Sequence, residues 1–201
     1  MTTVSGTEIH DAVKILKNGG IVVYPTETVY GIGCDPLNRQ ACERIQLIKR
    51  RSENKSFILI ADSPECIEKF AGPLDDTAKR LAMAFWPGAL TIVIRAQKDL
   101  PNHLKGPSEG VAFRVTPNPV ASALSSEFGR PVVSTSANIT TEQPVESYED
   151  ALQMFGGKVD CILKSDGPLR GNPSTVIDIT ASEPRLLRVG AISEERIREA
   201  L

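Results

Sequence analysis

The chain has 201 residues, of which 41% are hydrophobic and 24% are charged, and its formal net charge is -2. This is ordinary globular composition and is long enough for a well-buried domain, so neither a disordered nor a fibrous chain is indicated. A general nucleic-acid binder usually has a clear basic excess, which this chain lacks, so any site for a polyanion must be local.

The cysteines and the N-terminal sequence bear on the compartment. The four cysteines form no CxxC pair and predict reduced, mostly buried thiols. The first residues lack the cationic, apolar and small-residue order of a signal peptide, and no apolar run approaches the ~20 residues that span a bilayer. The sequence therefore predicts a cytoplasmic protein without a membrane segment.

The first predicted element is an amphipathic helix over residues 9–16. Ser5 or Thr7 is its expected N-cap, and two glycines after Asn18 end it. A short buried strand is predicted over 21–24.

Pro25 ends that strand, because proline cannot donate a hydrogen bond to a neighbouring strand. The sequence PTETVYGIGCD (25–35) therefore begins at the carboxyl end of a strand. Open α/β sheets bind their ligands at such ends.

The rest of the chain alternates predicted helices and strands. The predicted helices lie near 38–48, where Asn38 is the expected N-cap, and near 63–71, 75–86, 119–128, 146–155 and after Ser193. The predicted strands lie at 57–61, 90–96, 111–115, 131–135, 159–163, 175–179 and 185–189. No internal repeat or low-complexity linker is present, so the sequence predicts one mixed α/β domain over 1–201, with a twisted sheet and helices on its faces.

A cationic run follows the second predicted helix. Residues 49–57 read KRRSENKSF and place Lys49, Arg51 and Lys55 directly before a predicted strand. One interpretation is solvated charge at the end of a helix. The other is a local site for a polyanion, with Lys49 and Arg51 at a solvent-filled cavity.

Small hydrogen-bonding side chains gather at the ends of two other strands. PVVSTSAN (131–138) and NPSTVID (172–178) contain Ser134, Thr135, Ser136, Asn138, Ser174 and Thr175. Helix caps and turns alone would explain such residues. Two hydroxyl-rich strand ends in one sheet can also line one crevice.

Two arginines lie inside predicted strands, Arg114 in VAFRV and Arg188 in LLRVG. A guanidinium is rarely buried without an anionic partner, which could be a structural carboxylate or a ligand. Together with the cationic run and the hydroxyl groups, these arginines favour a phosphate site.

Other kinds of site are not indicated. The chain has no GxxxxGK[ST] motif, and GIGC (31–34) lacks the third glycine of a dinucleotide fingerprint. His10 and His103 stand alone in the sequence, which argues against a hydrolytic triad or a histidine metal site. Chemistry here is expected to rely on positioning and charge.

Six motifs occur in one order: YPTETVYGIGCD, the K-x-R of KRRSENK, WPGALTIV, RVTPNP, STSAN and PSTVID. In that order the chain resembles the YrdC/TsaC family, the threonylcarbamoyl-AMP synthases, from about residue 8 to residue 192. The resemblance implies a single YrdC-like domain whose twisted, partly open mixed sheet surrounds a cationic cavity.

The resemblance also implies a reaction. L-threonine, bicarbonate or carbon dioxide, and ATP would give threonylcarbamoyl-AMP and pyrophosphate, for the threonylcarbamoyladenosine modification of tRNA. ATP would be a substrate whose Mg²⁺ is held mainly by the nucleotide, with no metal site in the protein. The partners would be these small molecules and downstream tRNA threonylcarbamoyl-transfer proteins, with weak RNA binding as a further possibility.

By its motifs the resemblance implies a role for each site residue. Lys49 and Arg51 would be catalytic. Thr28, Arg114, Ser136 and Ser174 would bind threonine, and Lys49, Arg51, Lys55, Ser134, Asn138 and Arg188 would bind ATP. Two alternatives stay open: a YrdC-like module that binds double-stranded RNA or tRNA, and a paralogue that catalyses a different adenylyl or carbamoyl transfer.

Overall fold

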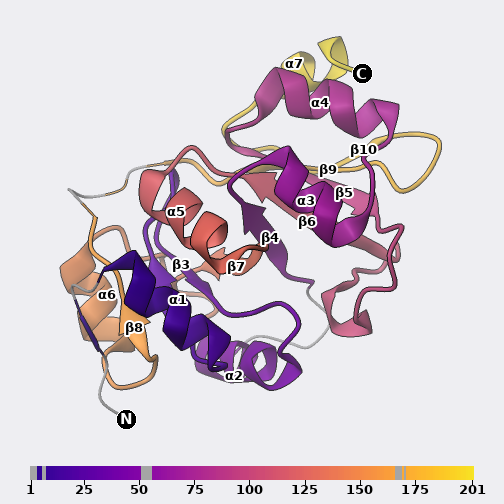
Figure 1. Ribbon diagram of the computed structural model, residues 1–201. Coiled ribbons are helices and arrows are strands. Elements are labelled where there is room, and N and C mark those ends of the chain that lie inside the picture. The colour runs from indigo at the N-terminus through magenta and orange to yellow at the C-terminus, as the bar shows by residue number, and fades with distance from the viewer. Residues whose placement is uncertain (1–3, 6–7, 51–55, 166–168, 170) are drawn as a thin grey trace.

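The computed structural model describes residues 4–5, 8–50, 56–165, 169 and 171–201. Within them the chain forms a mixed sheet in the order β1-β8-β2-β3-β7-β4-β6-β5-β9-β10, with helices packed on it (Figure 1). The strands are β1 (Val4–Ser5), β2 (Val22–Tyr24), β3 (Gly31–Gly33), β4 (Ile58–Ala61), β5 (Leu90–Arg95), β6 (Gly110–Val115), β7 (Val132–Ser136), β8 (Cys161–Ile162), β9 (Thr175–Asp178) and β10 (Arg185–Arg188). The helices are α1 (Ile9–Lys17), α2 (Arg39–Lys49), α3 (Pro64–Ala71), α4 (Asp76–Phe85), α5 (Pro119–Phe128), α6 (Tyr148–Phe155) and α7 (Glu194–Glu199), with a 3-10 turn at Asn102–Leu104.

The sheet mixes parallel and antiparallel pairs. β4 runs parallel to β6 and β5 runs parallel to β9, whereas β7 is antiparallel to both β3 and β4. β1 and β10 stand at opposite ends of the strand order, so the sheet is open. The predicted mixed α/β fold with a partly open sheet is confirmed.

Helices cover the sheet where its strands present apolar side chains. α1 and α5 lie side by side (Figure 1), and Leu16 and Leu124 belong to one buried cluster with Ile60 of β4. Leu59, the neighbour of Ile60, belongs instead to the main core with residues of α3 and α4. Successive residues of a strand point to opposite faces, so β4 is buried from both sides.

The N-cap residue was predicted correctly for α2 and wrongly for α1. Asn38 caps α2, as predicted, because its Oδ1 accepts a hydrogen bond of 3.0 Å from the Ala41 amide. For α1 the prediction was wrong: Glu8 occupies the cap position and Ser5 lies in β1, paired with Ile162. Thr7 lies outside the described residues. Because Ser5 is part of strand β1, it cannot cap α1.

Strand β3 lies inside PTETVYGIGCD, where no strand was predicted. It pairs with β2 and β7, and a Cβ added to Gly33 would lie 1.9 Å from the Val133 carbonyl oxygen. Glycine is therefore required for β3 to approach β7. Because glycine is disfavoured in strands, the sequence pattern did not predict β3.

The thiols agree with prediction. Cys34, Cys42 and Cys161 are buried, Cys66 is half-buried, and all four are free. Burial raises the pKa of Cys66 to about 11. Among the described residues, no helix combines the length and apolar character needed to cross a membrane, and the cytoplasmic location stays a prediction.

Candidate active site

One face of the sheet is hollowed into a cavity of about 860 Å³. Ser134 of β7 lies opposite Ile58, Ile58 lies opposite Ala112, and Ala112 lies opposite Val93, so these side chains share that face. Ile60 points to the same side but packs in the cluster that contains α5, so helices cover only part of the face. The volume is within the range of small-molecule sites.

Eight of the ten predicted site residues line this cavity. They are Thr28, Lys49, Arg114, Ser134, Ser136, Asn138, Ser174 and Arg188. Arg51 and Lys55 lie outside the described residues, although Lys49 and Ser56, which stand on either side of that stretch, both line the cavity. No carboxylate is among the described lining residues, so they make a cationic cavity, as predicted.

Lys49 is fixed to the loop that follows β7. Its ammonium donates to the carbonyl oxygens of Ser136 and Asn138 and, at 2.9 Å, to Asn138 Oδ1. An ammonium has three N–H donors, and these three acceptors match them. The residue lines the cavity, as predicted, but it is only 3% exposed, so its ammonium faces the loop more than solvent. Its position at the end of α2 aims it into the loop.

The loop is further ordered by its own side chains. Ser136 Oγ donates to Asn138 Oδ1 at 2.7 Å, and the Asn138 amide nitrogen donates to the carbonyl oxygens of Ile139 and Glu142. The Thr140 amide also donates to the Lys49 carbonyl at 2.8 Å. Lys49 and the STSAN loop therefore form one hydrogen-bonded unit at the cavity wall.

Arg114 has a structural partner and also lines the cavity. Its Nη1 lies 3.1 Å from Glu27 Oε1, and the two side chains are 7% and 15% exposed. Thr116 Oγ1 donates to the other carboxylate oxygen of Glu27 at 2.7 Å. The sequence left two partners open for this arginine, a structural carboxylate and a ligand. In the structure Arg114 pairs with a carboxylate and also faces the cavity, so it can have both.

Ser174 joins Arg188 to strand β5. Arg188 Nε donates to the Ser174 carbonyl at 2.9 Å and Nη2 donates to Ser174 Oγ at 3.0 Å. That hydroxyl also lies 2.9 Å from Thr91 Oγ1. Ser174 and Arg188 were predicted to serve different substrates, and the structure places them in direct contact.

Burial of the Arg188 guanidinium and the nearby Arg114 charge lower the pKa of Arg188. Two guanidinium groups close enough to repel each other make a strong site for an anion.

The chain after β10 is held close to β9. Thr175 Oγ1 accepts from the Gly190 and Ile192 amides and donates to the Ile192 carbonyl. A Cβ added to Gly190 would lie 2.0 Å from the Pro173 carbonyl oxygen. This close approach sets where Arg188, two residues earlier, meets Ser174.

The sequence analysis missed two residues that contact cavity-lining side chains: Thr91, which contacts Ser174, and Glu27, which pairs with Arg114. Thr91 is the single polar residue before the arginine in LTIVIR, and it is fully buried. Glu27 is the one acid in PTETVYG. A buried polar residue in an apolar strand needs a hydrogen-bond partner, which was a usable signal for Thr91.

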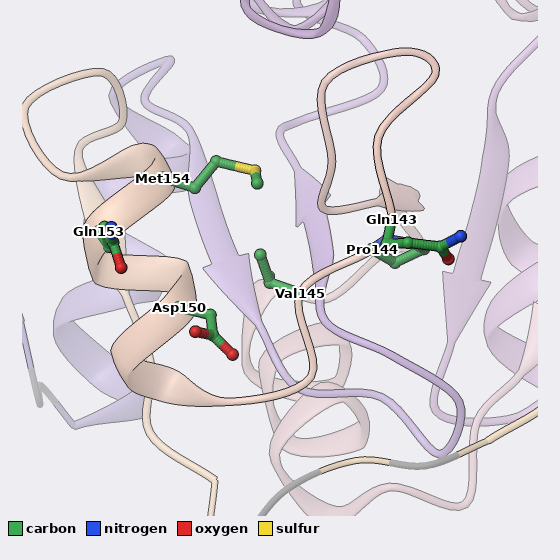
Figure 2. Close-up of a pocket in the computed structure, with 6 residues that line it drawn as sticks. All are labelled: Gln143, Pro144, Val145, Asp150, Gln153 and Met154. Atoms are coloured by element: carbon green, nitrogen blue, oxygen red, sulfur yellow. The ribbon is translucent and has the colours of Figure 1, made fainter.

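A second hollow has a volume of about 460 Å³ (Figure 2). Gln143, Pro144 and Val145 line it from the segment between β7 and α6, and three residues of α6 line its other side, namely Asp150, Gln153 and Met154. Pro144 lines both hollows. Within the described ranges, no group of three or more His, Cys, Asp or Glu side chains is placed to hold a metal ion.

Comparison with known proteins decides the family. A family model named for Sua5, YciO and YrdC, and described as "Telomere recombination", matches residues 14–190. The chain belongs to the Sua5/YciO/YrdC family. It is 42% identical over 161 residues to a threonylcarbamoyl-AMP synthase of Coxiella burnetii, covering 80% of this chain and 86% of the relative. A synthase of Psychromonas ingrahamii is 38% identical over 184 residues, covering 90% of this chain and 96% of the relative.

Solved structures of the Sua5/YciO/YrdC family have the same fold. P. abyssi Sua5 in complex with L-threonine superposes with a TM-score of 0.88 at 33% identity, covering all of this chain. The chain spans 60% of the length of that Sua5. E. coli YciO superposes with a TM-score of 0.83 at 28% identity, covering 98% of both chains. The resemblance seen in the six sequence motifs is confirmed.

Proposed function

We propose that this Sua5/YciO/YrdC protein is an L-threonylcarbamoyladenylate synthase that serves the threonylcarbamoyladenosine modification of tRNA. The observation that carries the proposal is the cavity, where Lys49, Arg114 and Arg188 converge with hydroxyl groups in a chain similar to named synthases. L-threonine bound to P. abyssi Sua5 supports an amino acid as one substrate. The other substrates are bicarbonate or carbon dioxide, and ATP.

Threonine binds at the Arg114 end of the cavity. The guanidinium pairs with the substrate carboxylate, and the hydroxyl groups of Thr28, Ser136 and Ser174 are available for the remaining polar atoms. Arg114 is only 6% exposed and its Nε has no hydrogen-bond partner among the described residues. A buried donor of this kind is satisfied when an anionic ligand arrives.

The chemical step joins two anions. The threonine amine and carbon dioxide form a carbamate, whose oxygen attacks the α-phosphorus of ATP while the bond to pyrophosphate breaks. Positive charge from Lys49, Arg51, Lys55 and Arg188 lowers the repulsion and stabilises the charge that moves onto pyrophosphate. Ser134 and Asn138 complete the ATP side.

Mg²⁺ enters this proposal on the triphosphate of ATP. Magnesium usually keeps several waters and binds nucleotide phosphates with few protein ligands, which suits a cavity wall without carboxylates among its described residues. The enzyme class is a nucleotidyltransferase, because the AMP moiety is transferred to the carbamate. The product is reactive, so tRNA threonylcarbamoyl-transfer proteins are the proposed downstream partners.

A test of the function measures pyrophosphate release from ATP and Mg²⁺ by the purified protein. Release is expected only when threonine and bicarbonate are both present. Equal release without threonine would contradict the proposal. Serine lacks one methyl group, which is worth about 1 kcal/mol or somewhat more in a fitted pocket, so it should be used less well but not excluded.

A second candidate is a different adenylyl or carbamoyl transfer by the same cavity. The observation that favours it is the match to E. coli YciO over 98% of both chains, because this fold is shared by family members with different names. A screen of amino acids and amines in the same assay separates the two. Preference for an acceptor other than threonine would favour this candidate.

A further inference from the structure

We infer that Glu27 is a positioning residue, which holds the Arg114 guanidinium in place for the carboxylate of the amino-acid substrate. This inference rests on the proposed function and adds a residue to its site. Glu27 is absent from the cavity lining, whereas Arg114 lines it, so Glu27 acts on the ligand through Arg114.

The contacts of Glu27 leave its carboxylate little freedom. Oε1 lies 3.1 Å from Arg114 Nη1, and Oε2 accepts a hydrogen bond of 2.7 Å from Thr116 Oγ1. Thr116 is itself buried, and its hydroxyl oxygen accepts the Asn118 amide at 3.2 Å. Oε1 has no hydrogen-bond partner among the described residues, so the carboxylate is held by one hydrogen bond, from Thr116, and by its ion pair with Arg114.

The segment that carries Glu27 also carries a predicted ligand residue. Thr26 Oγ1 donates to the Val29 carbonyl at 2.6 Å, accepts the Thr28 amide at 3.2 Å and lies 3.0 Å from Thr28 Oγ1. These bonds keep the turn around Glu27 rigid. The ion pair of Glu27 with Arg114 thus connects the turn that carries Thr28 to Arg114, and both of these residues are proposed to contact threonine.

The negative charge of Glu27 also balances positive charge beside the cavity. Burial, together with the nearby Arg114 charge, lowers the pKa of Arg188, and the described cavity lining contains no acid. Without Glu27, the Arg114 guanidinium would be buried with a like charge beside it and no carboxylate. Glu27 therefore compensates the charge of Arg114 and holds the guanidinium in place, while leaving its Nε for the ligand.

The experiment measures threonine binding by calorimetry and the KM values for threonine and ATP in adenylate formation. Glu27→Gln removes the charged partner of the buried Arg114, so it should raise the threonine Kd and KM by roughly tenfold to a hundredfold and change the ATP KM less than about threefold. Glu27→Asp should recover part of the loss. Thr116→Val, which keeps both charges, should give a smaller rise in the same direction.

A double-mutant cycle identifies the route of the effect. In an Arg114→Ala background, Glu27→Gln should change the threonine Kd by less than about twofold, because the group it positions is gone. Additive effects of the two substitutions would overturn the inference, as would equal increases in the KM for threonine and ATP.

Asp160→Asn is the matched control, because Asp160 is as exposed as Glu27, at 15%, and pairs with an arginine, Arg44, at 3.2 Å. Neither Asp160 nor Arg44 lines the cavity. This substitution should lower thermal stability without moving the threonine Kd. If Glu27→Gln moves only stability, as this control does, the positioning role is wrong. If the wild-type chain forms no adenylate yet binds threonine, the proposed function fails while the calorimetric cycle still tests Glu27.

Discussion

Lys49 offers the sharpest test of how the cavity wall is held together, through the substitution Lys49→Ala. The change removes an ammonium that donates to the Ser136 carbonyl and to both oxygens of Asn138. Each charge-assisted bond contributes about 1.5–3 kcal/mol, but water from the cavity can replace part of this at the exposed carbonyls. We therefore expect the free energy of unfolding to fall by about 2–4 kcal/mol.

In a domain of this size each kcal/mol corresponds to about 2–4 °C, so Tm should fall by about 5–15 °C. Thermal and denaturant unfolding measure the effect. Lys17→Ala is the matched control, because Lys17 also lies in the last turn of a helix but is exposed. Adenylate formation by Lys49→Ala should fall by roughly a hundredfold as the STSAN loop and its charge are lost. A Tm within about 1 °C of the wild type, matching the control, would refute the reasoning.

The remaining predictions concern the substrates. Ser174→Ala removes a hydroxyl proposed to contact threonine and should raise the threonine KM by roughly tenfold, more than it raises the KM for ATP; equal effects on both would argue against its assignment. Arg51→Lys should keep only part of the adenylation rate, because an ammonium cannot meet two phosphate oxygens in one plane; full activity would remove Arg51 from the phosphate site. Serine should support synthesis with a kcat/KM lower by about tenfold, measured in direct competition with threonine; no discrimination would mean that the methyl group is not bound.

Much of the fold could be predicted because local signals and tertiary packing agree. The strand over 111–115 and the helix over 119–128 appear within one residue of their predicted bounds. Both are bounded by residues that favour turns. The cap of α2 was predicted for the same reason, since Asn38 needs only the amide three residues later.

What was missed depends on contacts between distant residues. β3 is a strand only because β2 and β7 approach it, and its glycines give no local sign of that. The pairing of Glu27 with Arg114 and the contact of Ser174 with Arg188 are set by the stacking of strands, not by sequence spacing. Sequence motifs could therefore identify which residues share the cavity, but not which of them hold one another.

The burial of Lys49 shows the same limit. A lysine at the end of a helix in a cationic run is usually solvated, and nothing in KRRSENK indicates that the loop after β7 closes on it. The loop supplies three oxygen acceptors, which is what a buried ammonium requires. Cavity charge and loop order are consequently coupled in this protein.

The central claim is that this cavity joins threonine, carbon dioxide and AMP in one product. The most direct measurement incubates the purified protein with ATP, Mg²⁺, threonine and ¹³C-labelled bicarbonate, and follows the products by mass spectrometry. The account predicts threonylcarbamoyl-AMP whose mass rises with the label, formed together with pyrophosphate and absent when threonine is omitted. ATP consumption that yields no labelled adenylate, or a labelled adenylate that forms without threonine, would contradict it.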